Sequence, residues 1–283
     1  MYKKALLAIL ALAMASLACG FQTNFPTPVV KSPGKEIRQD ISVNFPAGAA
    51  SLELTFGAGE MTLASGAEHF VDGTAKYNIP DLKPEIKTEG GKVSITQGNY
   101  KMNGIPVLNN IQNEWDFKLS KTPMDLTIKA GAYKGHYDFG GLALTNLSVS
   151  DGAAEVTADF SSKNLEKMNI LSYTTGASNV TLKNLANANF STLIFESGAG
   201  NYKLDFGGML QRDGSATIRS GVSNLTLVIP ASMAATVKVG GGLSNVQFPS
   251  GWDKNDDIYT QKGSGPMLTI VVEMGAGNVQ ITQ

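Results

Sequence analysis

Residues 193–204 read LIFESGAGNYKL, and this stretch contains the pattern that decides the fold. Apolar residues recur with a spacing of two before the glycines, at Leu193 and Phe195, and again after them, at Tyr202 and Leu204. Alternation with a period of two is typical of a β-strand with one buried face. The sequence Gly-Ala-Gly-Asn between the two halves predicts a turn.

The same pattern recurs along most of the chain. Its first glycines are Gly57, Gly131, Gly152, Gly176, Gly198, Gly221, Gly242 and Gly275. From Gly131 to Gly242, successive glycines are 21, 24, 22, 23 and 21 residues apart. The last interval is longer, at 33 residues, and the first, of 74 residues, has room for about three units with weaker signatures.

A repeat of about 22 residues that holds short strands and no helix is the signature of a β-solenoid. In such a fold, like residues of successive coils stack into ladders, and a lone coil cannot bury its apolar face. We therefore predict an all-β fold, a single-stranded and β-helix-like β-solenoid with coils of about 22 residues.

One polar column recurs beside the turn. The third residue after the glycine is asparagine in five units, namely Asn179, Asn201, Asn224, Asn245 and Asn278. Asparagine tolerates the left-handed backbone of a turn, and stacked asparagines can also bond to each other along the axis. We favour this structural turn ladder, with Asn201 and Asn245 one coil from Asn224, over a column that binds sugar or metal.

The N-terminus predicts export. Lys3 and Lys4 precede an apolar run, 5–18, that is too short to span a bilayer but suits a secretory signal. Cys19, the only cysteine, follows directly, so residues 1–18 resemble a bacterial lipoprotein signal, in which the cysteine is acylated. Ser16 departs from the commoner aliphatic residue of that signal. An ordinary signal peptide with an incidental cysteine is the alternative.

The organisation expected from these features has four parts. The lipoprotein signal at 1–18 precedes a proline-rich tether at 19–39, which contains Pro26, Pro28 and Pro33. An N-terminal β domain at 40–125 and a β-solenoid repeat domain at 126–283 follow. We expect an extracytoplasmic protein, anchored to the cell membrane as a lipoprotein through its N-terminal lipid.

The chain resembles a known family at several of these motifs. Leu52–Leu63, with GAGE at 57–60, leads into DGTAKYN at 72–78, which looks like the N-terminal domain of the bacterial toast-rack family. The later glycine–alanine–x–Asn coils look like the "putative adhesin" and LiaF-like β-solenoid domains. The resemblance covers roughly residues 40–283 and implies an exported β-solenoid with an adhesive or stress-sensing role. It transfers no catalytic residue.

Residues suited to catalysis or metal binding are sparse. The 23 basic and 24 acidic residues leave no basic stripe for nucleic acid. His69 and His136 lack metal-ligand spacing, and no nucleophile-elbow motif is present. Glu60 and Glu155 are ladder carboxylates, for which a solvated turn is favoured over glycosidase chemistry. We predict no catalytic site, no metal and no cofactor.

The long interval near the C-terminus leaves two sites to interpret. Residues 253–257, DKNDD, begin like a calcium loop, but Ile258 and Ser264 stand where glycine and glutamate are needed, so a hydrated loop is favoured. The extra residues, 249–266, include Trp252 and Tyr259. These aromatic residues predict either a partner-binding loop or a cap on the terminal coil.

The resulting functional hypothesis is a binding or adhesion module at the cell envelope, with an envelope glycan or a protein as partner. The alternative is an envelope-stress sensing or regulatory domain that acts through a membrane partner.

Overall fold

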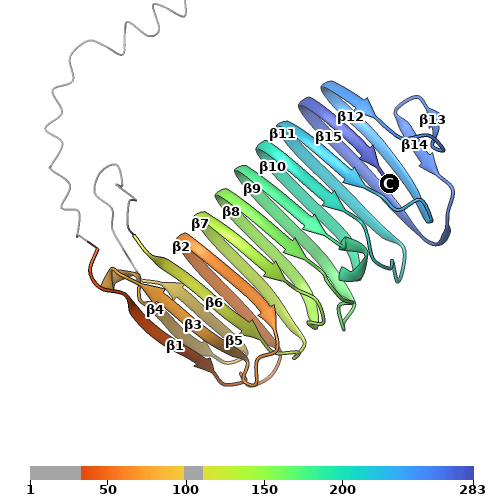
Figure 1. The fold of residues 1–283 in the computed structure, drawn as a ribbon. Helices are drawn as coiled ribbons and strands as arrows, with labels where there is room; N and C mark the ends of the chain where they lie inside the picture. The colour runs from red at the N-terminus through yellow and green to blue at the C-terminus, as the bar shows by residue number, and fades with distance from the viewer. Residues whose placement is uncertain (1–32, 99–110) are drawn as a thin grey trace, which may run out of the picture. The chain divides into compact units, whose positions relative to one another are not determined.

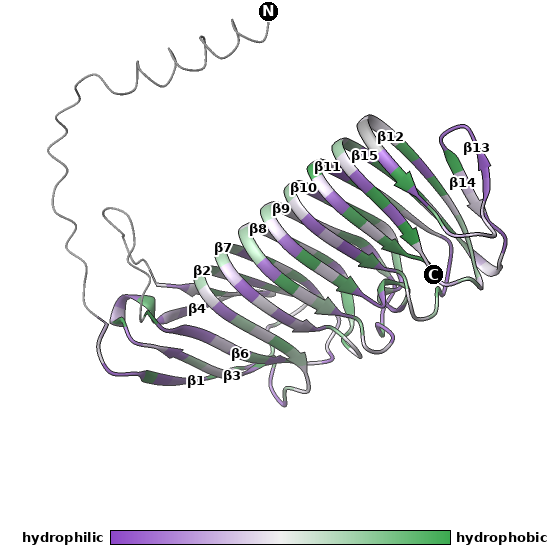
Figure 2. Cartoon of the chain, turned by 45° about the horizontal axis from the view of Figure 1, so that its top comes forward, coloured by the Kyte–Doolittle hydropathy of each residue, from purple (hydrophilic) through white to green (hydrophobic). Residues whose placement is uncertain are grey.

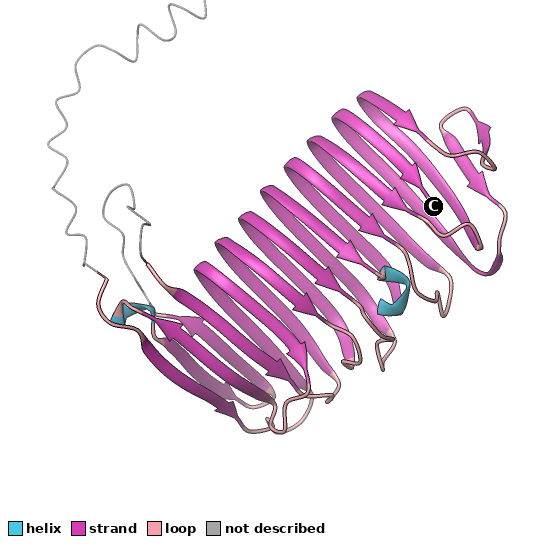
Figure 3. Ribbon diagram, in the orientation of Figure 1, coloured by secondary structure: helices cyan, strands magenta, loops and turns pink. Residues whose placement is uncertain are grey.

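The computed structural model describes residues 33–98 and 111–283, and strands make up most of this part (Figures 1 and 3). Its helices are two short 3₁₀ turns, η1 at Pro80–Leu82 and η2 at Leu185–Ala188. Neither of these has the length or the apolar sequence that a membrane-spanning helix requires.

Eight long strands pair side by side, all in parallel, and each forms one coil. In spatial order they are β2 (Ala50–Ser65), β7 (Met124–Asp138), β8 (Leu144–Asp159), β9 (Met168–Lys183), β10 (Phe190–Asp205), β11 (Gly214–Val228), β15 (Ser264–Thr282) and β12 (Met233–Gln247). The predicted all-β solenoid is therefore confirmed.

Each long strand bends along its length, so that its two halves lie in two layers (Figure 1), and its repeat glycine lies near the middle of the strand. We call the halves before the glycine the amino layer and those after it the carboxyl layer. Phe195 and Tyr202, which lie on opposite sides of Gly198, meet with ring centroids 5.2 Å apart. The apolar positions of both layers thus share one core, and Figure 2 shows the alternation of apolar and polar residues along each strand.

The repeat glycines form a column in which a side chain would collide with the next coil. A Cβ added to Gly198 would lie 2.7 Å from the carbonyl oxygen of Gly176, and one added to Gly131 would lie 2.3 Å from that of Gly57. This close approach explains why glycine recurs at the bend of successive long strands.

The order of the last coils differs from their order in the sequence. β15, the C-terminal strand, lies between β11 and β12, so β12 is the outermost coil. The chain leaves β12, forms β13 (Asp253–Asn255) and β14 (Ile258–Gln261), and then enters β15. The extra residues of the 33-residue interval therefore form the β13–β14 hairpin at the outer side of β12. In this hairpin, β14 pairs with the amino half of β12 in antiparallel fashion.

The N-terminal end holds one coil made of two separate strands. β5 (Lys92–Gln97) pairs with the amino half of β2, and β6 (Asn113–Leu119) with its carboxyl half. β4 (Pro84–Glu89) covers β5, while β3 (Val71–Tyr77) covers β6. The interval from Gly57 to Gly131 therefore contains this split coil and edge strands, and the expectation of about three further coils is wrong.

Two predicted boundaries fall inside secondary structure. β1 (Ile37–Val43), the antiparallel neighbour of β3, begins within the tether predicted at 19–39. β7 spans the boundary predicted at 125/126 and pairs with β2 on one side and β8 on the other. The described residues before and after this boundary therefore belong to one sheet.

Candidate functional site

The asparagine ladder lies on the exposed face of the carboxyl layer, which we call the asparagine face. Nδ2 of Asn201 donates to Oδ1 of Asn179 (2.9 Å), and Nδ2 of Asn224 donates to Oδ1 of Asn201 (3.0 Å). Nδ2 of Asn278 continues the series by donating to Oδ1 of Asn224 (2.8 Å). Asn245 of β12 lies in register with Asn278.

The ladder differs from the sequence prediction in two respects. Among the described residues, the non-glycine residues with positive φ are Asn184, Asn189 and Asp256, so the left-handed turn expected for the ladder asparagines is wrong. Asn224 also has Asn201 and Asn278 as its neighbours, and not Asn245. The reason is that β15 lies between β11 and β12.

The ladder leaves hydrogen-bonding capacity directed to solvent. An asparagine amide has two N–H donors and two acceptor lone pairs. Within the ladder, Asn201 and Asn224 each use one donor and one acceptor. Each therefore keeps one donor and one acceptor at an exposed position, repeated at the strand spacing of about 4.8 Å.

The ladder row continues into charged residues toward the N-terminal end. Strand register places the row in the order Asn179, Glu155, Lys134, Glu60, Glu114, Lys76 and Arg38, which come from β9, β8, β7, β2, β6, β3 and β1. The asparagine face thus has a neutral amide half and a half that carries three acidic and three basic residues in the ladder row.

A groove of about 510 Å³ lies in the charged half, over β1, β3, β6 and β2. Register places Thr74, Asp116 and Thr62 in one row across it. The ladder row, with the longer side chains of Lys76 and Glu114, lies on one side of this row, and Lys118 lies on the other. The floor of the groove thus includes two short threonines, Thr62 and Thr74, while longer side chains such as Lys76, Glu114 and Lys118 lie on its two sides.

The polar groups of the groove differ in their pairing. Lys76 Nζ lies 4.0 Å from Glu114 Oε2, and the Asp72 carboxylate accepts from the backbone amide and ring of His69. These bonds lower the pKa of Asp72. Within residues 33–98 and 111–283, the side chains of Glu60 and Asp116 make no hydrogen bond or ion pair, so both carboxylates can interact with a ligand.

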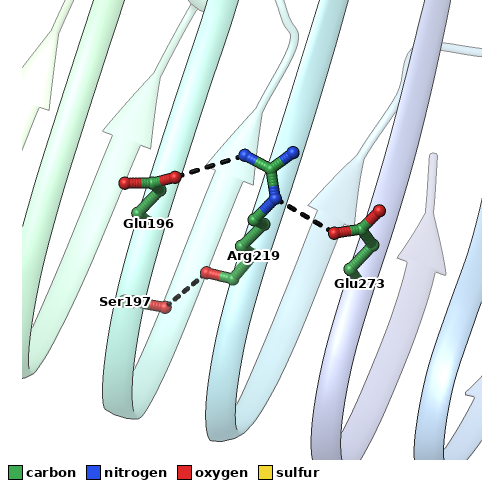
Figure 4. A network of polar contacts seen from close by, with 4 residues as sticks. All are labelled: Glu196, Ser197, Arg219 and Glu273. Atoms are coloured by element: carbon green, nitrogen blue, oxygen red, sulfur yellow. Dashed lines mark hydrogen bonds and ion pairs between the residues drawn. The ribbon is translucent and has the colours of Figure 1, made fainter.

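The opposite, amino-layer face carries an ion network that crosses three coils (Figure 4). The Arg219 guanidinium on β11 lies 3.0 Å from Glu273 of β15 and 3.2 Å from Glu196 of β10. Hydrogen bonds with Glu273 and then Glu196 raise the pKa of Arg219. These side chains are about half exposed, and exposed ion pairs contribute only about 0–1 kcal/mol, so the network fixes side-chain positions more than stability.

A buried carboxylate lies inside the bend. Asp151 is 8% exposed, and its oxygens accept from the hydroxyls of Tyr173 (2.7 Å), Tyr133 (3.4 Å) and Thr175. Burial is the main cause that raises the pKa of Tyr133 and Tyr173. Hydroxyl donors from the two neighbouring coils, β7 and β9, satisfy this carboxylate, which indicates a structural role.

Trp252 and Tyr259, the aromatic pair of the predicted partner-binding loop, are buried. Trp252 is 7% exposed and Tyr259 4% exposed, and both belong to the core. A ligand could reach little of either ring. The structure therefore favours the alternative interpretation, in which this segment caps the terminal coil.

The remaining candidates are scattered. His69 lies near Asp72, and His136 is exposed on β7 in register with Thr62. Asp253 and Asp257 belong to the exposed β13–β14 hairpin, where Asp257 lies 3.6 Å from Lys238. In the part of the chain that the structure describes, no group of three or more His, Cys, Asp or Glu side chains could hold a metal ion. Cys19 lies outside the described residues.

The groove could not be predicted from the sequence because its walls come from segments far apart in the chain. Lys76 and Glu114 meet only through the antiparallel pairing of β3 with β6. The available signal was the alternation of charged and apolar residues at 114–119, EWDFKL, which marks a strand with one exposed charged face. The partner strand and its register could not be read from that alternation.

Residues 30–183, more than half of the chain, match the sequence profile of a family described as "N-terminal domain of toast_rack, DUF2154". The chain belongs to this family. The matched toast_rack residues begin before β1 and end with β9, and so include the groove and the first asparagine of the ladder.

Solved structures are similar to the chain, and one with a TM-score above 0.5 shows the same fold. A "putative cell adhesion protein" from Clostridium sporogenes is 22% identical, with a TM-score of 0.51, over 91% of this chain and all of that one. A "putative adhesin" from Parabacteroides merdae is 11% identical, with a TM-score of 0.35, over 90% of this chain and 99% of that one. No curated protein matches the chain.

Proposed function

We propose that this toast_rack protein is a non-catalytic binding module of the cell envelope, held at the membrane by a lipid on Cys19. Its ligand would lie along the asparagine face, parallel to the axis on which the coils stack. The observation that carries the proposal is the hydrogen-bonded row of Asn179, Asn201, Asn224 and Asn278.

The chemistry of this face favours a linear, hydroxyl-rich polymer. A hydroxyl group is both donor and acceptor, which complements an amide that keeps one of each. Next to the asparagine row, register places a second polar row that runs Thr157, Thr181, Lys203 and Thr226. Regular rows of this kind can repeat one contact many times, so weak single contacts add to a useful affinity. An envelope glycan has these properties.

The name of the Clostridium sporogenes structure, a cell adhesion protein, agrees with such a role. A lipid anchor would add to it by keeping the face near other envelope polymers. Replacement of Cys19 by serine tests the anchor. We expect Cys19→Ser to move the protein from the membrane fraction to the soluble fraction, and an unmodified N-terminus elsewhere in an intact-mass measurement would refute lipidation.

The ligand is tested with envelope polysaccharide from the bacterium that encodes the chain, immobilised and probed with the mature protein. The double variant Thr181→Val/Thr226→Val removes two hydroxyls from the asparagine face without changing side-chain shape. We expect binding to weaken about tenfold, since two lost hydrogen bonds cost about 1–3 kcal/mol.

The matched control is Thr174→Val/Thr217→Val, which changes the opposite face of the same strands, β9 and β11. It should bind as the parent does, and all variants should keep the parental melting temperature. Equal loss from both pairs would contradict binding on the asparagine face. Recovery of a sensor kinase with the membrane-anchored protein, without any polysaccharide binding, would instead favour the stress-sensing alternative.

A further inference from the structure

The two ends of the stack present four half-coil edges, and the chain covers three of them with its own antiparallel strands. β4 covers β5 and β3 covers β6 at one end. At the other end, β14 covers the amino half of β12, at Ala235–Lys238. The fourth edge is the carboxyl half of β12, residues 243–247. It pairs with β15 on one side and, among the described residues, with no strand on the other.

An open strand edge presents unpaired N–H and C=O groups to any extended chain, and soluble proteins usually protect such edges with charge or proline. The outer strands of this protein follow that rule. β1 has Arg38 and Asp40, β13 has Asp253 and Lys254, and β4, with the sequence PEIKTE, has a proline and three charges. Residues 243–247, LSNVQ, have neither charge nor proline. The fourth edge is thus the one without protection.

The apolar core also ends at this edge. Val246 is only partly buried, and Phe248, just after β12, is 37% exposed. In the next coil inward, Val279 and Ile281 occupy the corresponding positions and are at most 2% exposed. Phe248 packs edge-on against Tyr259 of β14, with centroids 4.8 Å apart. A strand added beside 243–247 would cover Val246 and Phe248 as each coil covers its neighbour.

We propose that residues 243–247 of β12 form a strand-addition site for an extended, uncharged segment of a partner polypeptide. The added strand would complete the coil of which β14 already forms the other half. Antiparallel addition matches the three caps that the chain provides for itself. Alternate apolar side chains of the partner would contact Val246 and Phe248, and its main chain would supply the hydrogen bonds.

The chain's own undescribed internal segment is an unsuitable occupant. Residues 99–110 join β5 to β6 at the other end of the stack, eight strand positions or about 38 Å from β12. A twelve-residue segment that must leave and return reaches at most about 20 Å. This edge belongs to the same carboxyl layer as the asparagine face, but strand addition uses main-chain groups at the end of the stack, so its role does not depend on the proposed glycan binding.

The probe is a synthetic peptide with uncharged ends and the sequence Thr-Val-Thr-Val-Thr-Val-Thr, added to the isotope-labelled mature chain. We expect amide shifts, together with slower hydrogen exchange, confined to residues 243–248 and the adjacent β14. A peptide with proline at the central valine should not bind, because proline removes a main-chain donor. Absence of any shift at millimolar peptide would overturn the proposal.

Asn245→Lys places a positive charge on the open edge, as natural edge strands do to prevent pairing with other chains. It should weaken peptide binding at least tenfold. The matched control is Asn179→Lys, at the same column of an interior coil, where β7 already has Lys134. It should leave binding unchanged. Equal weakening by both variants would overturn the site. Concentration-dependent dimerisation that Asn245→Lys abolishes would show a second copy to be the occupant and overturn the assignment to a partner segment.

Discussion

At the scale of the residue, substitutions of Asn224 can distinguish a turn conformation from a strand conformation. Its φ is negative, and it lies within a strand that pairs on both sides. Valine suits an extended strand, whereas glycine in a strand costs backbone entropy and packs nothing. Both substitutions lose the hydrogen bonds to Asn201 and Asn278.

We therefore predict that Asn224→Gly destabilises the protein by about 1–2 kcal/mol and Asn224→Val by less. A left-handed turn would reverse this order, because a β-branched residue is strained at positive φ. Urea denaturation of the two variants measures the difference. A larger loss for valine than for glycine would contradict the strand conformation.

The buried tyrosines provide a second test at this scale. Burial raises the pKa of Tyr173 and Tyr137 well above the ordinary value of 10.0, and the negative charge of Asp151 raises both further. A tyrosine whose pKa is higher in the folded state stabilises the fold fully below pH 10. That contribution falls as the pH rises above 10, because the unfolded chain then loses the proton first.

We predict that the free energy of unfolding decreases above pH 10 by up to about 1.4 kcal/mol per pH unit for each such tyrosine. Tyr173→Phe removes one of these tyrosines, so its free energy of unfolding should decrease less steeply above pH 10. The variant also loses the hydrogen bond to Asp151, so it should be less stable than the parent at pH 8. Denaturation series between pH 8 and pH 11 give the slopes. Identical slopes for the parent and Tyr173→Phe would count against this account.

At the scale of the element, the sequence predicted the eight coils with a repeat glycine but neither the split coil nor the order of the last coils in the stack. Alternation around the glycine located the bend of every long strand, since the buried positions follow directly from it. The same regularity hid the spatial order, because β12 and β15 have the same pattern, and that pattern does not determine which of them pairs with β11. The groove on the asparagine face was hidden for a related reason, since β1, β3 and β6 pair across long separations in sequence. The asparagine row itself was visible, although its conformation was not.

The β13–β14 hairpin provides the prediction at this scale. Trp252 precedes β13, is 7% exposed and belongs to the core, so its loss leaves a large cavity at the end of the stack. We predict that Trp252→Ala lowers the free energy of unfolding by about 3–5 kcal/mol without changing polysaccharide binding. Thermal and urea unfolding measure the first effect, with the exposed Asp253→Ala as a control that should be neutral. Retention of the parental melting temperature by Trp252→Ala would argue against the cap.

At the scale of the whole molecule, both ends of the stack are built from internal segments of the chain. At one end, the split coil of β5 and β6 is the outermost coil and β2 is the next one inward. At the other end, β12 is the outermost coil and β15 is the next one inward. Removal of the C-terminal strand would therefore not shorten the stack from its end but open a gap within it. The residues on either side of the gap match, since Gly242 and Gly221 both lie in register with Gly275.

We predict that a chain ending at Gly263 still folds, because β12 moves one strand position and packs directly on β11. In the complete chain, Thr226 and Gln247 are both in register with Gln280, so they lie two strand spacings, about 9.6 Å, apart. A disulfide requires Cα atoms within about 7 Å. In a background without Cys19, the pair Thr226→Cys/Gln247→Cys should crosslink only in the shortened chain. The pair Thr226→Cys/Gln280→Cys should crosslink in the complete chain and serves as its control. A shortened chain that unfolds, or that folds without the crosslink, would show that β12 depends on β15 for its position.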